Sequence, residues 1–272
     1  MLLLSGGAPI NPEVMDFFKV AFSVPFMEAY GQTEGMGAEF STFGFEKYSG
    51  GVGSCFEHME FKLVDVPEMN YTHQDKDEQG NPTPRGELWI RGPNVTRGYY
   101  KNTEKTDELI EDGWMKSGDI VTLVGKNKSL KIIDRKKHIF KLSQGEYIAP
   151  EKLENIYKSA NQLIANIFVY GNSNNDYIVA VINVEKGCLE KLAENFQVNS
   201  KENLAENEEL KTKIVQQLEE YRIEKNLNYL EKIQKIVIDD IDWLEHDLVT
   251  PTFKNQRLKL LKRYKEKLEA LY

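Results

Sequence analysis

The sequence predicts an α/β protein made of two domains, residues 1–134 and residues 135–272. A chain of 272 residues could hold one large domain or two ordinary ones, since domains typically run about 100–200 residues. Three patterns favour two domains: an α/β unit at the start, short alternating strands from position 50 to 131, and a new mixture of strands and helices after Asp134. We therefore expect the end of a large α/β fold with a small β-barrel or antiparallel sheet, followed by a small α+β domain.

The N-terminal segment is expected to form a strand, a glycine turn, a helix and a second strand. Leu2–Leu4 is a short apolar run, which we predict to be a buried strand of a parallel sheet. Asn11 and Pro12 are typical of a helix start, and the helix would carry one apolar face, made of Val14, Phe17, Phe18 and Phe22. Val24–Tyr30 is the second strand. Because a parallel sheet needs further partners, this segment is predicted to be the middle of a larger fold.

The remaining elements follow from alternation, turn residues and helix-start signals. In the first domain we predict strands at Glu60–Asp65, Gly86–Arg91 and Ile120–Val124, an exposed loop from Asn70 to Pro84 and a helix at Thr103–Ile110. In the second we predict a helix from Pro150, strands at Ala165–Tyr170, Tyr177–Val184 and Lys235–Asp239, and helices at Cys188–Phe196, Leu204–Leu227 and Lys254–Leu271. The charged segment from position 199 to 213 is predicted to be solvated surface.

Composition limits the class of function. The chain is 40% hydrophobic and 29% charged, which is typical of a soluble globular protein with a core. Its net charge of −8 argues against a general nucleic-acid binder, because such proteins gather Lys and Arg against phosphates. Cys55 and Cys188 lie far apart with no metal-like spacing, which suits a reducing compartment. The N-terminus does not resemble a signal peptide, and no run approaches the ~18 apolar residues that span a bilayer.

Five motifs occur in a fixed order and cover essentially the whole chain. They are Tyr30–Glu34, Gly86–Tyr100, Asp112–Asp119, Ile132–Lys137 and Gly145–Glu154. In this order they resemble the motifs of the adenylate-forming, AMP-binding enzymes. Their amino-acid sequences most resemble those of long-chain fatty-acid–CoA ligases. The resemblance implies that a fatty acid and ATP form an acyl-adenylate, and that CoA then displaces AMP to give the thioester. Long-chain fatty acid, ATP, Mg²⁺ and CoA would be the partners, and nucleic acid would not.

Two glycine-containing turns are candidate parts of a nucleotide site. Ser5–Pro9, with Gly6, Gly7, Ala8 and Pro9, resembles the loop that lies against adenine, where glycine lets the backbone approach a flat base. An ordinary tight turn is the alternative. Tyr30 and Gly31 precede Thr33 and Glu34, which offer a hydroxyl to a phosphate and a hard oxygen ligand to Mg²⁺. Without the resemblance, the Thr-Glu pair would be interpreted as a helix cap.

Asp119 and Arg135 are further candidates. Asp119 follows Gly118 at the predicted entrance to a strand, where a carboxylate can accept both hydroxyls of a ribose. A turn aspartate is the alternative. Arg135 carries a rigid fork of donors suited to phosphate or ribose oxygens, and the resemblance implies that it contacts the nucleotide. The alternative is a surface ion pair with Asp134.

The resemblance also assigns residues to a mobile second domain. Lys137 stands at the position about which this domain would swing, although many relatives have Asp there, and a solvated charge cluster is the alternative. Lys254 lies in a segment that resembles the family's terminal lysine motif. Its ammonium could offset negative charge on the reacting carboxylate and α-phosphate, while the Lys141–Gly145 loop would face the site for thioester formation. Phe253 stands where most relatives have Gly, and Lys254 could otherwise simply open a basic helix.

The family's phosphate loop and most of its acyl tunnel lie upstream of the motifs found here. We therefore expect a C-terminal portion of a long-chain acyl-CoA ligase with little or no activity alone. The alternatives are a non-catalytic nucleotide- or CoA-binding module and another adenylate-forming enzyme, such as an aryl-CoA ligase. The family implies the cytoplasm or the cytosolic face of the endoplasmic reticulum or peroxisome, with membrane association in a full-length form.

Overall fold

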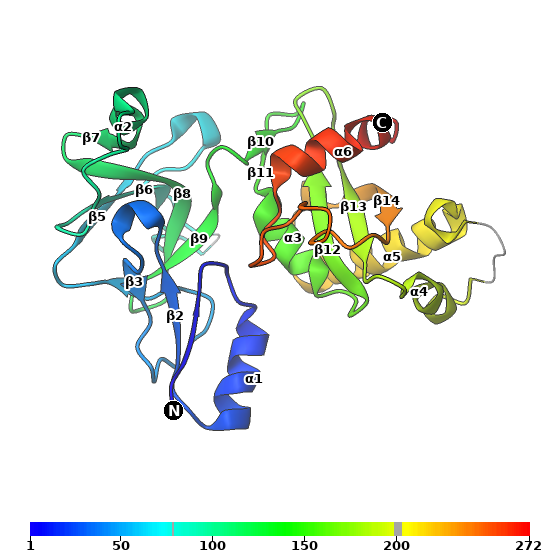
Figure 1. The fold of residues 1–272 in the computed structure, drawn as a ribbon, viewed down its shortest axis with the longest axis horizontal. Helices are drawn as coiled ribbons and strands as arrows, with labels where there is room; N and C mark the ends of the chain where they lie inside the picture. The colour runs from blue at the N-terminus through cyan, green and yellow to red at the C-terminus, as the bar shows by residue number, and fades with distance from the viewer. Residues whose placement is uncertain (78, 199–202) are drawn as a thin grey trace. The chain divides into compact units, whose positions relative to one another are not determined.

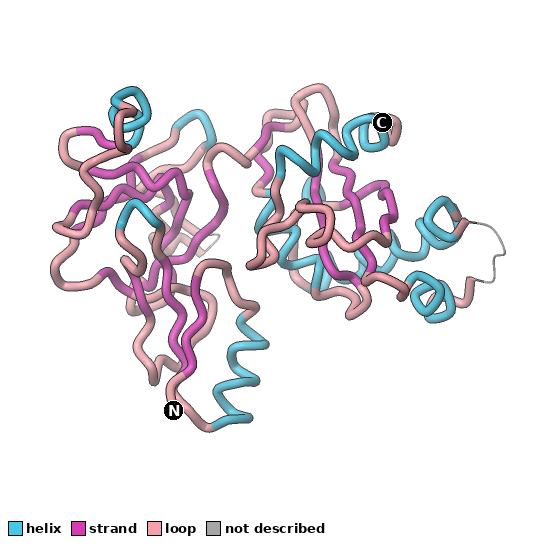
Figure 2. The backbone as a smooth tube through the Cα atoms, in the orientation of Figure 1, coloured by secondary structure: helices cyan, strands magenta, loops and turns pink. Residues whose placement is uncertain are grey.

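The computed structural model describes residues 1–77, 79–198 and 203–272. It divides into two compact units, Met1–Lys137 and His138–Tyr272, which are described separately. Figure 1 shows the order of the elements and Figure 2 shows how helices and strands alternate along the chain. The units divide after Lys137, whereas the boundary after Asp134 stays a prediction of the motifs.

The first sheet of the N-terminal unit combines one parallel and two antiparallel pairings. Its strands are β1 (Leu3–Gly6), β2 (Phe26–Tyr30), β3 (Phe40–Ser41) and β4 (Ser54–Cys55), in that order. The parallel strands β1 and β2 are joined by α1 (Pro12–Phe22), and the Asn11 side chain caps this helix by accepting the Glu13 N–H at 2.8 Å. The predicted strand, helix and strand are therefore present, and local capping chemistry accounts for the helix start.

The prediction that Leu2–Leu4 is buried is wrong. The side chains of Leu2 and Leu4 are 55% and 66% exposed. Among the described residues β1 pairs with β2 alone, so it forms an edge of the sheet. The predicted apolar face of α1 is also largely exposed at Val14, Phe17 and Phe22, although Met15 is buried. Strand and helix form as expected, but the described residues of this unit leave the side chains of Leu2, Leu4, Val14, Phe17 and Phe22 largely uncovered.

The second sheet of this unit is antiparallel throughout, as predicted. Its elements are β5 (Glu60–Val64), η2 (Pro67–Met69), β6 (Arg85–Arg91), α2 (Thr103–Leu109), β7 (Ile110–Glu111), β8 (Trp114–Val124) and β9 (Ser129–Arg135). The strand order is β5-β6-β8-β7, with β9 also paired to β8. Phe40, Leu88, Ile90, Met115 and Leu130 are buried together and form the core.

Two local predictions for this sheet need correction. Because β8 starts at Trp114 and is longer than expected, Asp119 lies inside the strand rather than at its entrance. The predicted exposed loop from Asn70 to Pro84 is partly anchored. Tyr71 is buried, and the Arg85 guanidinium lies 4.7 Å from the centre of its ring.

The C-terminal unit is an α+β domain, as predicted. It contains a β10–β11 hairpin and the sheet β12-β13-β14, in which β12 and β13 are antiparallel while β13 and β14 are parallel. The elements are β10 (Phe140–Lys141), β11 (Tyr147–Ile148), α3 (Pro150–Lys158), β12 (Ile164–Tyr170), β13 (Ile178–Val184), α4 (Leu189–Asn195), η3 (Leu204–Glu206), α5 (Glu208–Glu224), η4 (Tyr229–Glu231), β14 (Ile233–Asp239) and α6 (Arg257–Glu269).

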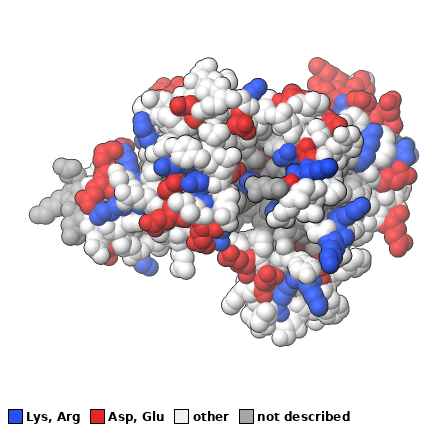
Figure 3. Space-filling view, turned by 180° about the vertical axis from the view of Figure 1, so that it is seen from behind, with Lys and Arg blue, Asp and Glu red and all other residues white. Residues whose placement is uncertain are grey.

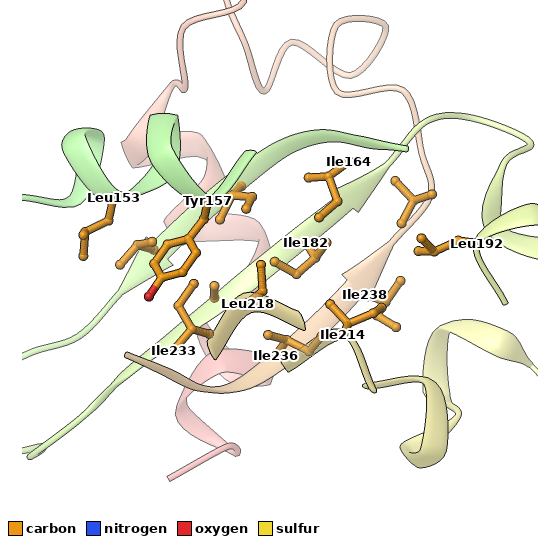
Figure 4. Packing of buried hydrophobic residues seen from close by; sticks show 14 of the residues in the cluster. Leu153, Tyr157, Ile164, Ile182, Leu192, Ile214, Leu218, Ile233, Ile236 and Ile238 are labelled. Atoms are coloured by element: carbon orange, nitrogen blue, oxygen red, sulfur yellow. The ribbon is translucent and has the colours of Figure 1, made fainter. Parts of the chain in front are cut away.

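Both faces of this sheet are covered. Because side chains alternate along a strand, Ile178 and Ile182 of β13 face one side while Val179 and Val181 face the other. The first side packs against α3 and α5, with the side chains of Leu153, Tyr157, Ile182, Leu218 and Ile236 gathered together in Figure 4. The second side packs against α6 and the segment before it, through Trp243, Leu260 and Tyr264.

Two predicted helices begin later than expected. Asn207 interrupts the predicted Leu204–Leu227 helix, because its side chain accepts the Leu210 N–H at 2.9 Å and caps α5. The helix predicted from Lys254 begins at Arg257. Of the charged segment predicted as surface, residues 199–202 lie outside the described residues.

Acidic and basic side chains are interspersed on the face shown in Figure 3 and do not gather into one basic patch. Among the described residues, no helix combines the length and apolar character needed to cross a bilayer.

Candidate functional site

The ends of β1 and β2 bring two predicted turns to the same edge of the first sheet. The strands are parallel with Gly6 opposite Ala29, so the Gly6–Pro9 loop and Gly31 leave the sheet side by side. A Cβ at Gly31 would lie 1.6 Å from the carbonyl oxygen of Gly37, which no side chain could tolerate. Gly7 has a φ of +82°, in the left-handed region that favours glycine. Glycine is therefore required at this edge for backbone geometry.

A tyrosine, a carboxylate and a guanidinium meet beside this edge. The Tyr30 hydroxyl donates to Asp119 Oδ2 at 2.5 Å, and Arg135 Nε lies 3.6 Å from Asp119 Oδ1. Asp119 is buried on β8 directly opposite Arg135 on β9, whose side chain is 45% exposed. Burial and the nearby charge of Asp119 raise the pKa of Tyr30, so its hydroxyl stays a donor. Three residues predicted separately therefore form one cluster.

Arg135 contacts Asp134 through its backbone and Asp119 through its side chain. Asp134 is buried and its Oδ1 accepts the backbone N–H of Arg135 at 2.6 Å. The Arg135 guanidinium is instead directed to Asp119 by the register of β8 and β9. The next residue, Lys136, pairs with Glu87 at 3.2 Å, which ties the end of β9 to β6.

Thr33 and Glu34 lie in a short 3₁₀ turn, η1 (Thr33–Gly35), just after β2. Gln32 is the N-terminal cap of this turn, so the helix-cap interpretation of Thr33 is not supported. Thr33 is exposed, and Glu34 Oε1 accepts the Tyr99 hydroxyl at 2.6 Å. This hydrogen bond, with burial and the charge of Glu34, raises the pKa of Tyr99 to about 12. An exposed hydroxyl beside a fixed carboxylate is a donor set that fits a phosphate and Mg²⁺.

Sequence reasoning missed Glu39, which lies behind the same turn. It is fully buried, and neither carboxylate oxygen has a hydrogen-bond partner among the described residues. A Cβ at Gly35 would lie 1.6 Å from Glu39 Oε1, so the carboxyl occupies the space that glycine leaves. Burial, followed by the charges of Asp119 and Glu34, raises the pKa of Glu39 to about 8. No motif or spacing in the sequence signals this residue.

The remaining predicted residues lie in the C-terminal unit or at its border. Lys141 and Gly145 belong to the β10–β11 hairpin, where Gly145 has a φ of +93°. Lys254 is exposed on a turn between β14 and α6, in which Phe253 has a φ of +58°. Lys137 is exposed at the last position of the N-terminal unit. The structure thus groups the predicted residues of the first unit, whereas those of the second lie on two separate loops.

Known sequences similar to this chain include a protein family model and fatty acyl-CoA synthetases. Residues 1–100 match the protein family described as AMP-binding enzyme. The chain is 39% identical to fatty acyl-CoA synthetase A of Dictyostelium discoideum over 276 residues, which are 99% of this chain and 40% of that protein. It is 40% identical to the peroxisomal long chain acyl-CoA synthetase 6 of Arabidopsis thaliana over 275 residues, 99% of this chain and 38% of that protein. The chain thus spans about two fifths of the length of these relatives.

Solved structures share the fold. The adenylation domain of a carboxylate reductase from Mycobacterium chelonae superposes with a TM-score of 0.81 at 34% identity, covering 99% of this chain and 38% of that one. The corresponding domain from Segniliparus rugosus, in complex with AMP and a co-purified carboxylic acid, gives a TM-score of 0.80 at 31% identity, with the same coverage of 99% and 38%. The α/β architecture predicted from the sequence is confirmed.

Proposed function

We propose that this chain, a relative of the AMP-binding, adenylate-forming enzymes, is part of an ATP-dependent, AMP-forming acyl–CoA ligase that acts on long-chain fatty acids. The observation that carries the proposal is the cluster of Tyr30, Asp119 and Arg135 beside the ends of β1 and β2. Open α/β sheets bind ligands at the carboxyl ends of their strands, and this cluster places a fixed carboxylate and a donor fork there. Similarity to fatty acyl-CoA synthetases along 99% of the chain supports the choice of acyl substrate.

The reaction would proceed in two steps. A fatty-acid carboxylate attacks the α-phosphate of ATP, forming acyl-adenylate and releasing pyrophosphate. The thiol of CoA then loses its proton to solvent, its sulfur attacks the acyl carbon, and AMP leaves with the electron pair of the broken acyl–oxygen bond. Activation is needed because a carboxylate is a poor electrophile, whereas AMP is a good leaving group.

Residues of the N-terminal unit would hold the nucleotide. Asp119 would accept hydrogen bonds from the ribose hydroxyls, and Arg135 would donate to ribose or phosphate oxygens. The Gly6–Pro9 loop, with Tyr30 and Gly31, would lie against the adenine. Thr33 would donate to a phosphate, and Glu34 would hold Mg²⁺, which offsets phosphate charge when bound.

The C-terminal unit would supply different residues in the two steps of the reaction. Lys254 would neutralise charge on the reacting carboxylate and α-phosphate in the first step, and the Lys141–Gly145 hairpin would serve the thioester step. Exchange between the two arrangements would occur by rotation about Lys137. The division of the chain into compact units directly after Lys137 supports this hinge.

We expect little or no turnover from this chain alone, because it spans about two fifths of the length of its relatives. The measurement is the formation of acyl-CoA from palmitate, ATP and CoA, compared with a full-length fatty acyl-CoA synthetase. A rate for the chain equal to that of the full-length enzyme would contradict this expectation. Binding without turnover is also the behaviour of the alternative, a non-catalytic nucleotide- or CoA-binding module.

Calorimetry with a non-hydrolysable palmitoyl-adenylate analogue tests the nucleotide site itself. We expect binding to the wild-type chain and at least a tenfold weaker affinity in Asp119→Ala, about 1.4 kcal/mol, because the ribose acceptor is lost. Asp119→Asn keeps the side-chain volume and provides a second variant should Asp119→Ala fold poorly. Asp107→Ala, at an exposed aspartate of α2, is the matched control and should bind normally. Equal affinity in all of these chains would refute the proposed site.

The compartment is also a proposal. We propose the cytoplasm or the cytosolic face of an intracellular membrane, and the peroxisomal name of one Arabidopsis relative supports the peroxisome. Fractionation of cells that express the tagged chain would show whether it sediments with peroxisomal markers. A purely cytosolic distribution would favour the cytoplasm over a membrane surface.

A further inference from the structure

The turn that presents Lys254 is a short hairpin with a buried base. Val249 and Asn255 form an isolated β-bridge, and Gln256 N–H donates to the Leu248 carbonyl at 2.9 Å. Thr250 N–H donates to the Lys254 carbonyl at 2.9 Å, which closes the tip. The side chains of Leu248 and Val249 are buried against the sheet, whereas positions 251–254 are exposed. Lys254 therefore lies at the tip of a folded hairpin, which we call the lysine hairpin (residues 249–255).

A buried carboxylate from another element joins the base of the lysine hairpin to the core. Glu154 lies on α3 and is 6% exposed. Its Oε1 accepts the Val169 N–H at 2.8 Å and Arg257 Nη1 at 2.5 Å, and its Oε2 accepts Asn255 Nδ2 at 3.0 Å. One side chain thus connects α3, β12, the lysine hairpin and the first residue of α6.

The same two partners also bind the open edge of β12. Among the described residues β12 pairs only with β13, so alternate carbonyl groups on its other side face away from the sheet. Asn255 Nδ2 donates to the Ile167 carbonyl at 2.8 Å, and Arg257 Nη2 donates to the Val169 carbonyl at 2.7 Å. The residues that follow Lys254 therefore bond to backbone groups whose positions are set by the sheet.

The donors at this junction match the oxygens of an ionised carboxylate. Burial raises the pKa of Glu154, and the charge of Arg257 with the donated hydrogen bonds only partly counteracts that rise. An ionised carboxylate accepts from all of its donors, whereas a glutamine amide would turn an N–H₂ group toward at least one of them. By contrast, the ion pair of Lys265 and Glu269 on α6 is exposed, and solvent screens it.

We propose that Glu154 is a positioning residue for Lys254. By binding Asn255 and Arg257 it fixes the lysine hairpin to β12, so that the ammonium is presented at one place on the C-terminal unit. The proposal rests on the role of Lys254 in the proposed function, but the anchoring itself requires no catalytic activity.

Hydrogen exchange measured by mass spectrometry tests the anchor in the full chain. The reporting amides are those of Thr250, Phe253, Lys254 and Gln256, whose N–H groups are all bonded within the hairpin or its base. In Glu154→Gln we expect these amides to exchange at least tenfold faster, with those of β13 changing less than twofold. Glu269→Gln, which alters an exposed ion pair with Lys265 on α6, is the matched control and should leave both sets within twofold.

Two results would overturn the proposal. One is unchanged exchange of the hairpin in Glu154→Gln, and the other is an equal acceleration throughout β13 and α5, which would show that Glu154 only stabilises the unit. If Glu154→Gln does not fold, Asn255→Ala decides, because it leaves the contact of Glu154 with Arg257 in place. It should accelerate the hairpin amides alone, and failure to do so refutes the anchor.

A kinetic experiment distinguishes a failure of this proposal from a failure of the proposed function. In an acyl-adenylate assay on a full-length enzyme that contains this segment, Lys254→Ala and Glu154→Gln should both lower kcat about tenfold or more with little change in the KM for ATP, which the proposed function assigns to the other unit. If Lys254→Ala leaves measurable adenylation unchanged, the proposed role of Lys254 fails, while the exchange experiment still judges the anchor. Full activity of Glu154→Gln despite a loosened hairpin would refute positioning.

Discussion

The sheet of the C-terminal unit and the first sheet of the N-terminal unit differ in how completely they are buried. Every residue of β13 is buried between helices on both faces. In the first sheet, Leu4 on β1 and Phe17 on α1 are more than half exposed. Exposed apolar clusters are typical of surfaces that contact another polypeptide, a membrane or a ligand. A strand and helix can therefore form from local signals before their apolar faces find a partner.

The two units also bury a glutamate in opposite ways. Glu154 accepts hydrogen bonds from Arg257, Asn255 and a backbone N–H, whereas Glu39 has no partner among the described residues. A buried charge is tolerated when it is paired and hydrogen-bonded, and it is costly when it is not. The C-terminal unit therefore depends on its buried acid, whereas the raised pKa of about 8 keeps the buried acid of the N-terminal unit protonated at lower pH.

The largest expected effect follows from this contrast. Glu154→Ala should lower the free energy of unfolding of the C-terminal unit by about 3–5 kcal/mol, because it leaves the guanidinium of Arg257, which is only 13% exposed, without its carboxylate. Chemical denaturation followed by Trp243 fluorescence measures this. A loss below about 1 kcal/mol would show that the two glutamates do not differ as described.

Core truncation tests the difference in burial. Leu153→Ala should destabilise its unit by about 2–5 kcal/mol, because Leu153 is completely buried. Phe17→Ala removes a larger side chain, yet should change stability by about 0.5 kcal/mol or less, because that ring is 65% exposed. Urea denaturation of both variants gives the comparison, and similar losses would mean that α1 is covered in solution, for example by self-association.

The pH dependence of folding stability tests the raised pKa of Glu39. Glu39 has its pKa raised from 4.5 to about 8, so the folded state holds this proton more tightly than the unfolded state does. Its contribution to stability is complete below about pH 4.5 and is lost as the pH rises toward 8, at up to about 1.4 kcal/mol per pH unit. Glu39→Gln should therefore be about 1–3 kcal/mol more stable than wild type at pH 8. Melting curves of both chains from pH 5 to pH 8 should converge at the acidic end, and parallel curves would contradict the assignment.

The smallest expected effect concerns the lysine hairpin. Phe253 adopts a φ of +58°, which glycine reaches without the steric cost borne by a bulky residue. Phe253→Gly should relieve about 0.5–1 kcal/mol of strain, partly offset by the greater freedom of glycine in the unfolded chain. Thermal denaturation would show a small rise or no change in Tm, while a clear fall would mean that the exposed ring makes a stabilising contact.

The sequence predicted what local chemistry determines. The start of α1 follows from Asn11 and Pro12, and the β12–β13 pair follows from two apolar runs around a polar turn. The start of α6 was placed too early, at Lys254 rather than Arg257. Contacts of Asn255 and Arg257 with a glutamate far back in the sequence hold the intervening residues in a hairpin, and no local pattern records them.

The candidate site shows the same limit. Motifs indicated Tyr30, Asp119 and Arg135 separately. Only the folded sheets show that the Tyr30 hydroxyl donates a hydrogen bond to the Asp119 carboxylate. Glu39 could not be predicted, because its burial depends on the missing side chain of Gly35 and on packing around it. Burial of Leu4 was predicted wrongly, since an apolar strand signals an affinity for neighbours rather than their presence.

The topology of the C-terminal sheet has a consequence for the order of folding. β12 and β13 are joined by a short turn, whereas β14 reaches β13 only after the chain has passed through α4 and α5. Contacts between distant segments form more slowly than local ones. The lysine hairpin also follows these segments during synthesis, and its anchors on α3 and β12 must already be in place. We therefore expect Lys254 to reach its final environment late, as one of the last events of maturation in this unit.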